Sequence, residues 1–197
     1  CVLPYQDYFH TKSDIELITN CLGLEFPFWG DIDKAKFGER VPGLNGDNLR
    51  LVVGDIVYET RYTQSNAHNY ELLRNEVVIA TVSAYFVVSD PNRSLGNLGG
   101  KIVWELISEP PVLVVDGKNI NEEYQLEGSF FPYEINGKLI YLAKKNGKYH
   151  IVYDGKVIGS EFDEISMAYC CAKLSVSYGK GQYWFLGRRN GVQSVVA

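Results

Sequence analysis

The residues whose types could support nucleophilic catalysis are two adjacent cysteines and three histidines. Cys170 and Cys171 stand in the segment MAYCCAKLSVSY, and the histidines are His10, His68 and His150. A catalytic cysteine needs a thiolate that a nearby base activates, and no local motif links these residues. The apolar residues around the two cysteines predict a strand, which turns neighbouring side chains to opposite faces. We therefore interpret Cys170 and Cys171 as structural residues, one of them in the core.

Acidic residues near the N-terminus offer a second kind of chemistry. Asp31, Asp33 and Asp47 could act as general acid and base, or hold a hard cation. Such pairs are defined by their separation in space, which the sequence does not give. Asp31 and Asp33 also suit the first turn of a helix, where the helix dipole favours negative charge. A hydrolase that uses these carboxylates, or a Cys-His pair, is therefore one hypothesis that stays open.

The sequence contains no motif for a metal or a cofactor. It has no HxH, HExxH or Cys-x-x-Cys arrangement, which argues against a zinc site. Residues 116–123 lack the acid spacing of a calcium-binding loop, and residues 179–181 lack the Gly-Lys-Ser/Thr of a phosphate-binding loop. We expect no metal site and no cofactor, and we assign no catalytic residue.

Composition and charge place the chain among globular proteins. Hydrophobic residues make up 46% of its 197 residues, charged residues 22%, and the net charge is −5. An acidic balance argues against a nucleic-acid partner, because that affinity depends on Lys and Arg at the phosphates. The longest apolar run, 77–88, contains Thr81 and Ser83 and is shorter than the roughly 20 residues that span a bilayer. We expect no transmembrane segment.

The first residue, Cys1, leaves the localisation open. An N-terminal cysteine is typical of a lipid-anchored bacterial protein after removal of its signal peptide, and such a protein is extracytoplasmic. A boundary made by another cleavage or by trimming explains the residue equally well, and a cytoplasmic protein then fits. A lipid anchor at Cys1 therefore stays a hypothesis.

The first 47 residues differ in pattern from the rest. Ser13 and Glu16 form a capping box before an apolar helical face, which predicts a helix over 13–22. A second, weaker helical turn is expected over 31–40, followed by a loop rich in Pro, Gly and Asn. We predict a helical lead-in or cap over 1–47 and a β-repeat domain over 48–197, which is one continuous core or a fragment of a longer repeat array.

From residue 49 onward the chain consists of runs of Val, Ile, Tyr, Phe and Trp separated by Asn-Gly, Asp-Gly and Gly-Gly. Such runs predict strands, and such dipeptides predict two-residue hairpin turns. The segment 61–76 shows no clear alternation. The predicted turns are Asp116-Gly117, Asn146-Gly147, Asp154-Gly155 and Asn190-Gly191.

Two segments of the second half repeat. GKLIYLAKKNG at 137–147 aligns without gaps to GQYWFLGRRNG at 181–191, which matches Leu142 with Leu186. VLVVDGKNINEEY at 112–124 aligns to HIVYDGKVIGSEF at 150–162. The fold class that follows is all-β, an antiparallel meander of repeated β-hairpins that is propeller-like or an open sheet, after a short helical segment.

This order of strand, Asn-Gly, second strand, Asp-Gly-Lys and return strand resembles the bacterial tandem repeats of WD40-like β-propellers. The resemblance covers residues 101–197 and, more loosely, 49–60. It implies sheets that follow one another as blades and build a surface for partners. A closed propeller needs at least about four blades of four strands, and this chain has fewer units. It is therefore a fragment of a longer array, or its repeats form a smaller sheet.

The function that these features favour is a non-enzymatic binding or scaffolding module. Fourteen tyrosines and three tryptophans suit a surface that binds a protein or a glycan, although strands also favour aromatic residues for packing. The alternatives that stay open are the hydrolase and a processed fragment of a larger β-repeat protein.

The binding residues are expected in the segment SDPNRSLGNLGG at 89–100. Its polar, Gly-rich composition predicts a long loop, and loops on a rigid sheet often carry recognition. We select Asn92, Arg93 and Asn97 as candidate binding residues; the guanidinium of Arg93 can pair with carboxylates or stack on aromatic rings.

Overall fold

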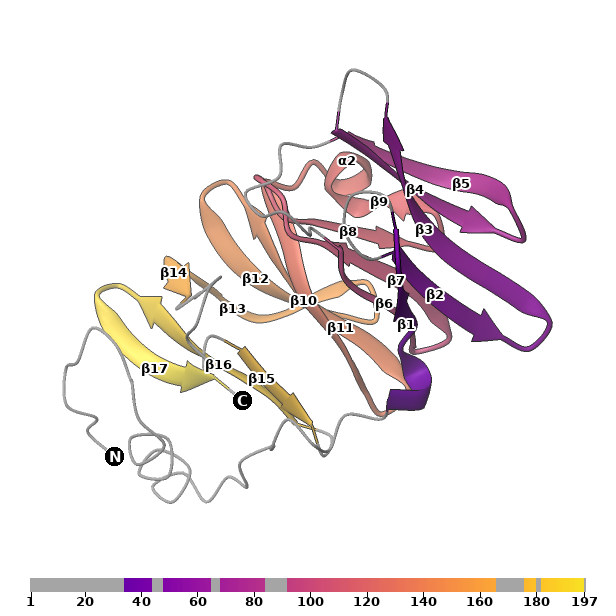
Figure 1. Cartoon of the computed structure of the whole chain (residues 1–197). Coiled ribbons are helices and arrows are strands. Elements are labelled where there is room, and N and C mark those ends of the chain that lie inside the picture. Colours follow the sequence, from indigo (N-terminus) through magenta and orange to yellow (C-terminus); the bar gives the residue numbers. More distant parts are fainter. Residues whose placement is uncertain are drawn as a thin grey trace. The chain divides into compact units, whose positions relative to one another are not determined.

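The computed structural model describes residues 34–43, 48–64, 68–83, 92–165, 176–179 and 182–196. The expected all-β class is confirmed, because antiparallel hairpin meanders make up most of this part (Figure 1). The chain divides into two units, residues 33–163 and residues 1–32 with 164–197. The helix predicted over 13–22 lies outside the described residues. Within 31–40 the structure has one 3-10 turn, η1 (Lys34–Lys36).

The first sheet of the larger unit contains five antiparallel strands in chain order. They are β1 (Glu39–Val41), β2 (Asn48–Val53), β3 (Ile56–Gln64), β4 (His68–Arg74) and β5 (Val77–Ser83). The described part of the segment 61–76, which lacks clear alternation, lies in β3, in β4 and in the turn at 75–76. Its pattern is obscured because Leu72 and Leu73 are both buried, next to a register shift between β4 and β5. β1, in the predicted lead-in, pairs with β2.

The middle sheet contains four strands and continues into a short helix. These elements are β6 (Asn92–Leu98), β7 (Lys101–Leu106), β8 (Val112–Val115), β9 (Lys118–Asn119) and α2 (Ile120–Tyr124). The prediction of a loop over 89–100 is wrong from residue 92 onward. Strand β6 covers Asn92–Leu98, and Gly99-Gly100 is a tight turn in which both φ angles are positive. Leu95 and Leu98, each 1% exposed, anchor this otherwise polar strand.

The third sheet contains four antiparallel strands, again in chain order. They are β10 (Gly128–Ile135), β11 (Lys138–Lys145), β12 (Lys148–Tyr153) and β13 (Lys156–Phe162). The smaller unit forms a separate sheet in which β16 pairs with all the others. Its strands are β14 (Glu164–Ile165), β15 (Val176–Gly179), β16 (Gln182–Arg189) and β17 (Val192–Val196).

All four predicted turns are confirmed. At Asp116-Gly117, Asn146-Gly147, Asp154-Gly155 and Asn190-Gly191, both central residues have positive φ angles, as a type I′ hairpin turn requires.

The repeated hairpins also share one register. Leu142 pairs with Ile151 between β11 and β12, and Leu186 pairs with Val195 between β16 and β17. Both pairs are separated from the hairpin turn by the same number of residues. Leu142 is fully buried, whereas the side chain of Leu186 lies outside the described part.

The middle sheet is covered on both faces by apolar side chains. Residues Ile102, Trp104 and Val114 pack in one cluster with residues of the first sheet, and Val103 and Leu113 pack in another with residues of the third sheet. Because side chains alternate along a strand, this double coverage makes β7 and β8 apolar at nearly every position. Among the described residues, no helix has the length and apolarity to cross a membrane.

Candidate functional site

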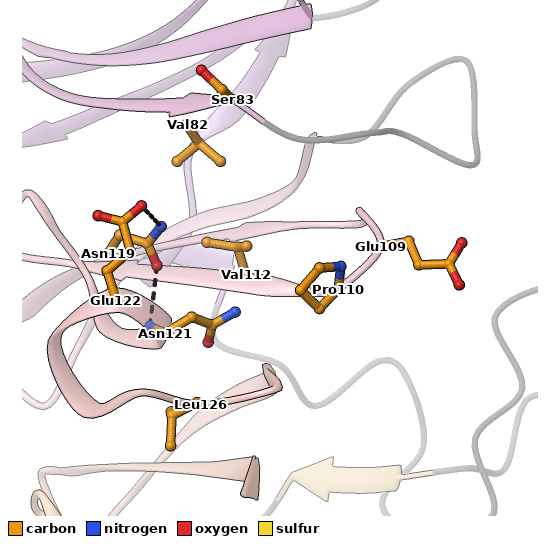
Figure 2. Close-up of a pocket in the computed structure, with 9 residues that line it drawn as sticks. All are labelled: Val82, Ser83, Glu109, Pro110, Val112, Asn119, Asn121, Glu122 and Leu126. Atoms are coloured by element: carbon orange, nitrogen blue, oxygen red, sulfur yellow. Dashed lines mark hydrogen bonds between the residues drawn. The ribbon is translucent and has the colours of Figure 1, made fainter.

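A pocket of about 340 Å³ lies where β5 ends, β8 begins and α2 follows β9 (Figure 2). Its volume falls at the lower end of the range of small-ligand pockets, about 300 to 1,000 Å³. The first sheet, the loop before β8 and the helical segment all contribute to its walls. The lining residues are Val82, Ser83, Glu109, Pro110, Val112, Asn119, Asn121, Glu122 and Leu126.

Asn119 positions the helical wall of the pocket. It is the N-cap of α2, and its Oδ1 accepts a hydrogen bond from the backbone N–H of Asn121 at 3.1 Å. Its Nδ2 donates to Oε1 of Glu122 at 2.8 Å. The helix ends at Tyr124, and its C-cap, Gln125, adopts the left-handed conformation with φ 54°. The cap therefore fixes the carboxylate of Glu122 on the first turn.

Asn121 forms a buried polar wall behind the cap. The residue is 8% exposed, and its Nδ2 donates to the carbonyl of Pro111 at 2.8 Å while its Oδ1 accepts from Ser129 Oγ at 2.6 Å. Ser129 Oγ in turn accepts from the N–H of Leu113 at 2.9 Å. Because each polar group has a partner, this wall is held in one arrangement.

The floor of the pocket is apolar and its rim is acidic. Val82 and Val112 are 3% and 5% exposed, and Pro110 and Leu126 extend the apolar surface. Glu109 and Glu122 also line the pocket and are exposed. Figure 2 shows the carboxylate of Glu122 beside Asn119 and that of Glu109 extended away from the other labelled side chains. None of the described residues that line the pocket is a Lys, Arg or His.

The candidate binding residues from the sequence lie elsewhere. Asn92, Arg93 and Asn97 all belong to β6, and Asn97 is not among the described residues that line the pocket. The side chains of Asn92 and Arg93 lie outside the described part, so their role in binding stays a prediction. Oδ1 of Asn97 is buried and has no hydrogen-bond partner among the described residues.

The residues considered for catalysis are mostly outside the described part. This holds for all four cysteines, for His10, for the three N-terminal aspartates and for the side chain of His68, so the hydrolase hypothesis stays a prediction. His150 is half-buried on β12, opposite Ala143. In the described ranges, no group of three or more His, Cys, Asp or Glu residues is placed to hold a metal ion.

Sequence reasoning missed the pocket, although one local signal was present. Asn119 and Glu122 have the three-residue spacing of a helix cap, but the alignment of 112–124 with 150–162 indicated a strand there. The other lining residues, such as Ser83 and Glu109, come together only when the sheets pack. No spacing in the sequence could reveal that.

Comparisons of the chain with protein families, with characterised proteins and with solved structures found no match.

Proposed function

We propose that the chain is a non-enzymatic binding module, and that the pocket at β5, β8 and α2 receives part of a protein partner. The observation that carries the proposal is the construction of the pocket. An apolar floor at Val82 and Val112 lies beneath a polar wall whose groups are fixed by hydrogen bonds. A pocket that combines an apolar floor with polar groups held in place suits recognition.

The chemistry of the lining favours binding over catalysis. Nucleophilic catalysis needs a nucleophile within hydrogen-bond reach of a base. The one hydroxyl among the described lining residues, that of Ser83, donates to the amide oxygen of Asn69, which is not a base. The amides of Asn119 and Asn121 are engaged in holding α2 and the loop before β8.

The lining also favours a protein partner over a glycan. Glycan sites commonly place an aromatic ring against the sugar face, and none of the nine lining residues is aromatic. Tyr124, 51% exposed on α2, lies outside the lining. An apolar recess with an acidic rim instead suits a side chain that an interface presents as an anchor.

The repeated sheets support the scaffolding part of the proposal. The middle and third sheets each contain four antiparallel strands in chain order, which is the strand arrangement of a propeller blade. We propose that these sheets are the units of a WD40-like repeat array and that they present the pocket on a rigid frame.

The test is to fill the pocket. Ser83→Trp places a large ring in the lining, whereas Val77→Trp adds the same ring at the other end of β5, where Val77 is 65% exposed. Proteins that crosslink to the wild-type chain and to each of the two variants are identified by mass spectrometry and compared. We expect Ser83→Trp to lose a partner that Val77→Trp retains.

Two outcomes would contradict the proposal. One is a partner profile that both tryptophan variants leave unchanged. The other is turnover of 4-nitrophenyl esters or glycosides that Ser83→Trp abolishes, because the pocket would then be an active site.

A further inference from the structure

We infer that Asn136 is a site of spontaneous deamidation and isomerisation, and that Glu127 protects Asn146 from the same reaction. The inference is independent of the pocket and of the binding proposal. It follows from a comparison of two turns of the third sheet, which share one dipeptide and one conformation and differ in a single hydrogen bond.

The two turns offer the same reactive dipeptide. Asn136-Gly137 joins β10 to β11, and Asn146-Gly147 joins β11 to β12. All four residues are exposed, and a Cβ on either glycine would meet no atom within 4 Å. Asparagine is among the thermolabile residues, and a following glycine speeds its reaction because no side chain hinders the approach of the glycine nitrogen.

The backbone conformation does not distinguish the turns. The φ angles are 51° and 52° at Asn136 and Asn146, and 71° and 72° at the glycines that follow them. Both turns are closed by a pair of strand residues, Ile135 with Lys138 and Lys145 with Lys148. Any barrier that the hairpin geometry sets against the reaction is therefore common to both, and a difference in rate must come from another contact.

The reaction uses the backbone nitrogen of the glycine as a nucleophile. Hydroxide removes the proton of Gly137 N, and the nitrogen forms a bond to Cγ of Asn136. The bond between Cγ and Nδ2 breaks, and Nδ2 takes up a proton from water and leaves as ammonia. Water then opens the five-membered ring at either carbonyl. The product is an aspartate or an isoaspartate, in which the main chain runs through Cβ and Cγ.

The two turns differ at this nitrogen. Gly147 N donates to Oε1 of Glu127 at 2.8 Å, whereas Gly137 N forms no hydrogen bond with any residue that the structure describes. The hydrogen bond to Glu127 must break before the nitrogen can turn toward Asn146. The charge of the carboxylate also opposes the loss of a proton from a group beside it. Both effects slow the reaction at Asn146 and leave Asn136 unprotected.

The experiment ages the folded full chain in a mildly alkaline buffer and maps its peptides by mass spectrometry at intervals. Digestion at acidic pH limits further reaction, and electron-transfer fragmentation separates aspartate from isoaspartate. We expect the products at residue 136 to accumulate roughly three to ten times as fast as those at residue 146, the factor that corresponds to the net free energy of one hydrogen bond.

Matched variants test the role of the carboxylate. Glu127 is exposed, and its backbone N–H donates to Lys144 O, a bond that Glu127→Ala retains. We expect Glu127→Ala to raise the rate at residue 146 to that at residue 136, and to leave the rate at residue 136 unchanged. Glu161→Ala removes another exposed carboxylate, on β13, and should change neither rate.

The chain unfolded in guanidinium chloride separates structure from sequence, because Ile135 precedes one asparagine and Lys145 the other. There we expect nearly equal rates at the two sites. Equal rates in the folded chain, or a difference that persists after unfolding, would overturn the inference. A rate at residue 146 that Glu127→Ala leaves unchanged, or the absence of products at residue 136, would do the same.

Discussion

Glu134 on β10 joins three segments that are distant in the sequence. Its Oε1 lies 2.5 Å from Nζ of Lys36, and its Oε2 accepts from the N–H of Gly99 at 2.7 Å. The hydrogen bond from Lys36, followed by that from Gly99, lowers the pKa of the Glu134 carboxyl below its usual value of 4.5. The carboxylate thus favours the folded state as long as it is ionised.

This pKa shift predicts a pH-dependent effect of Glu134→Gln. A group whose pKa is lower in the folded state contributes stability above its unfolded pKa, and that contribution is lost as the pH falls through the folded pKa. We expect the variant to be less stable at pH 7 by about 1 kcal/mol, a small value because Lys36 is partly exposed. The difference should shrink as the pH falls below 4.5.

Urea unfolding of both proteins from pH 7 to pH 2.5 measures this effect. Glu161→Gln on the exposed strand β13 is the control. A stability difference that stays constant over the whole range would show that the charge of Glu134 is not responsible.

Ser129 gives a second prediction at the scale of a residue. It is fully buried, accepts from Leu113 N and donates to Asn121 Oδ1. Ser129→Ala leaves a buried N–H and a buried amide oxygen without this partner, which should cost about 2 kcal/mol. Ser160→Ala, at an exposed position of β13, should cost less than about 0.5 kcal/mol. Chemical denaturation compares the two, and equal losses would mean that the hydroxyl of Ser129 is dispensable.

At the scale of elements, the turn at Gly99-Gly100 offers a matched pair of substitutions. Both residues have positive φ angles, 61° and 73°, which an L-residue adopts at a cost of about 1 kcal/mol. A Cβ on Gly99 would lie 2.6 Å from the backbone nitrogen of Leu139, whereas a Cβ on Gly100 would meet nothing within 4 Å. Gly99→Ala must therefore also displace the backbone of β11.

We expect Gly100→Ala to lower the free energy of unfolding by about 1 kcal/mol and Gly99→Ala by roughly 1 to 3 kcal/mol more. Thermal unfolding of the two variants measures the difference. If both substitutions had the same effect, the close approach of the turn to β11 would not hold in solution.

The elements that the sequence predicts are those whose conformation depends mainly on their own residues. Asn146-Gly147 and Asp154-Gly155 form the predicted turns because each dipeptide tolerates two positive φ angles. The turn at Asn75-Glu76 was missed because it has no glycine, although both φ angles are positive and Oδ1 of Asn75 accepts from Val57 N at 2.8 Å.

Strand β6 was missed for a different reason. Its composition is that of a loop, and only tertiary packing makes it a strand. Leu95 pairs with Trp104 in the core. Gly96 lies against Phe37, and a Cβ there would be 3.0 Å from the ring, closer than ordinary van der Waals contact, so the ring would have to shift. The pocket could not be predicted for the same physical reason, since the contacts that form it are between sheets.

At the scale of the larger unit, the middle sheet connects the two apolar clusters. Trp104 is fully buried against the first sheet, while its neighbour Val103 packs with residues of the third. A cavity on one face of such a sheet loosens the strands that support the other face, because both faces share the same backbone.

We therefore expect Trp104→Ala to destabilise the protein by about 3 to 5 kcal/mol and to speed amide hydrogen exchange in β3 and β11 alike. Val157→Ala, at a site that is 63% exposed, should change neither. Hydrogen exchange followed by mass spectrometry resolves the two regions. Faster exchange confined to β3 would show that the two clusters unfold independently.

The turns also differ in how much room surrounds them. A Cβ on Gly137, Gly147 or Gly155 would meet no atom within 4 Å, whereas one on Gly117 would lie 3.1 Å from the carbonyl oxygen of Ile79. Exposed turn tips with open space around them tolerate inserted segments. An epitope tag or a fluorophore-bearing peptide spliced between Asn136 and Gly137 should therefore report on the folded protein without displacing a neighbour, while the same graft after Asp116 would separate the first sheet from the middle one.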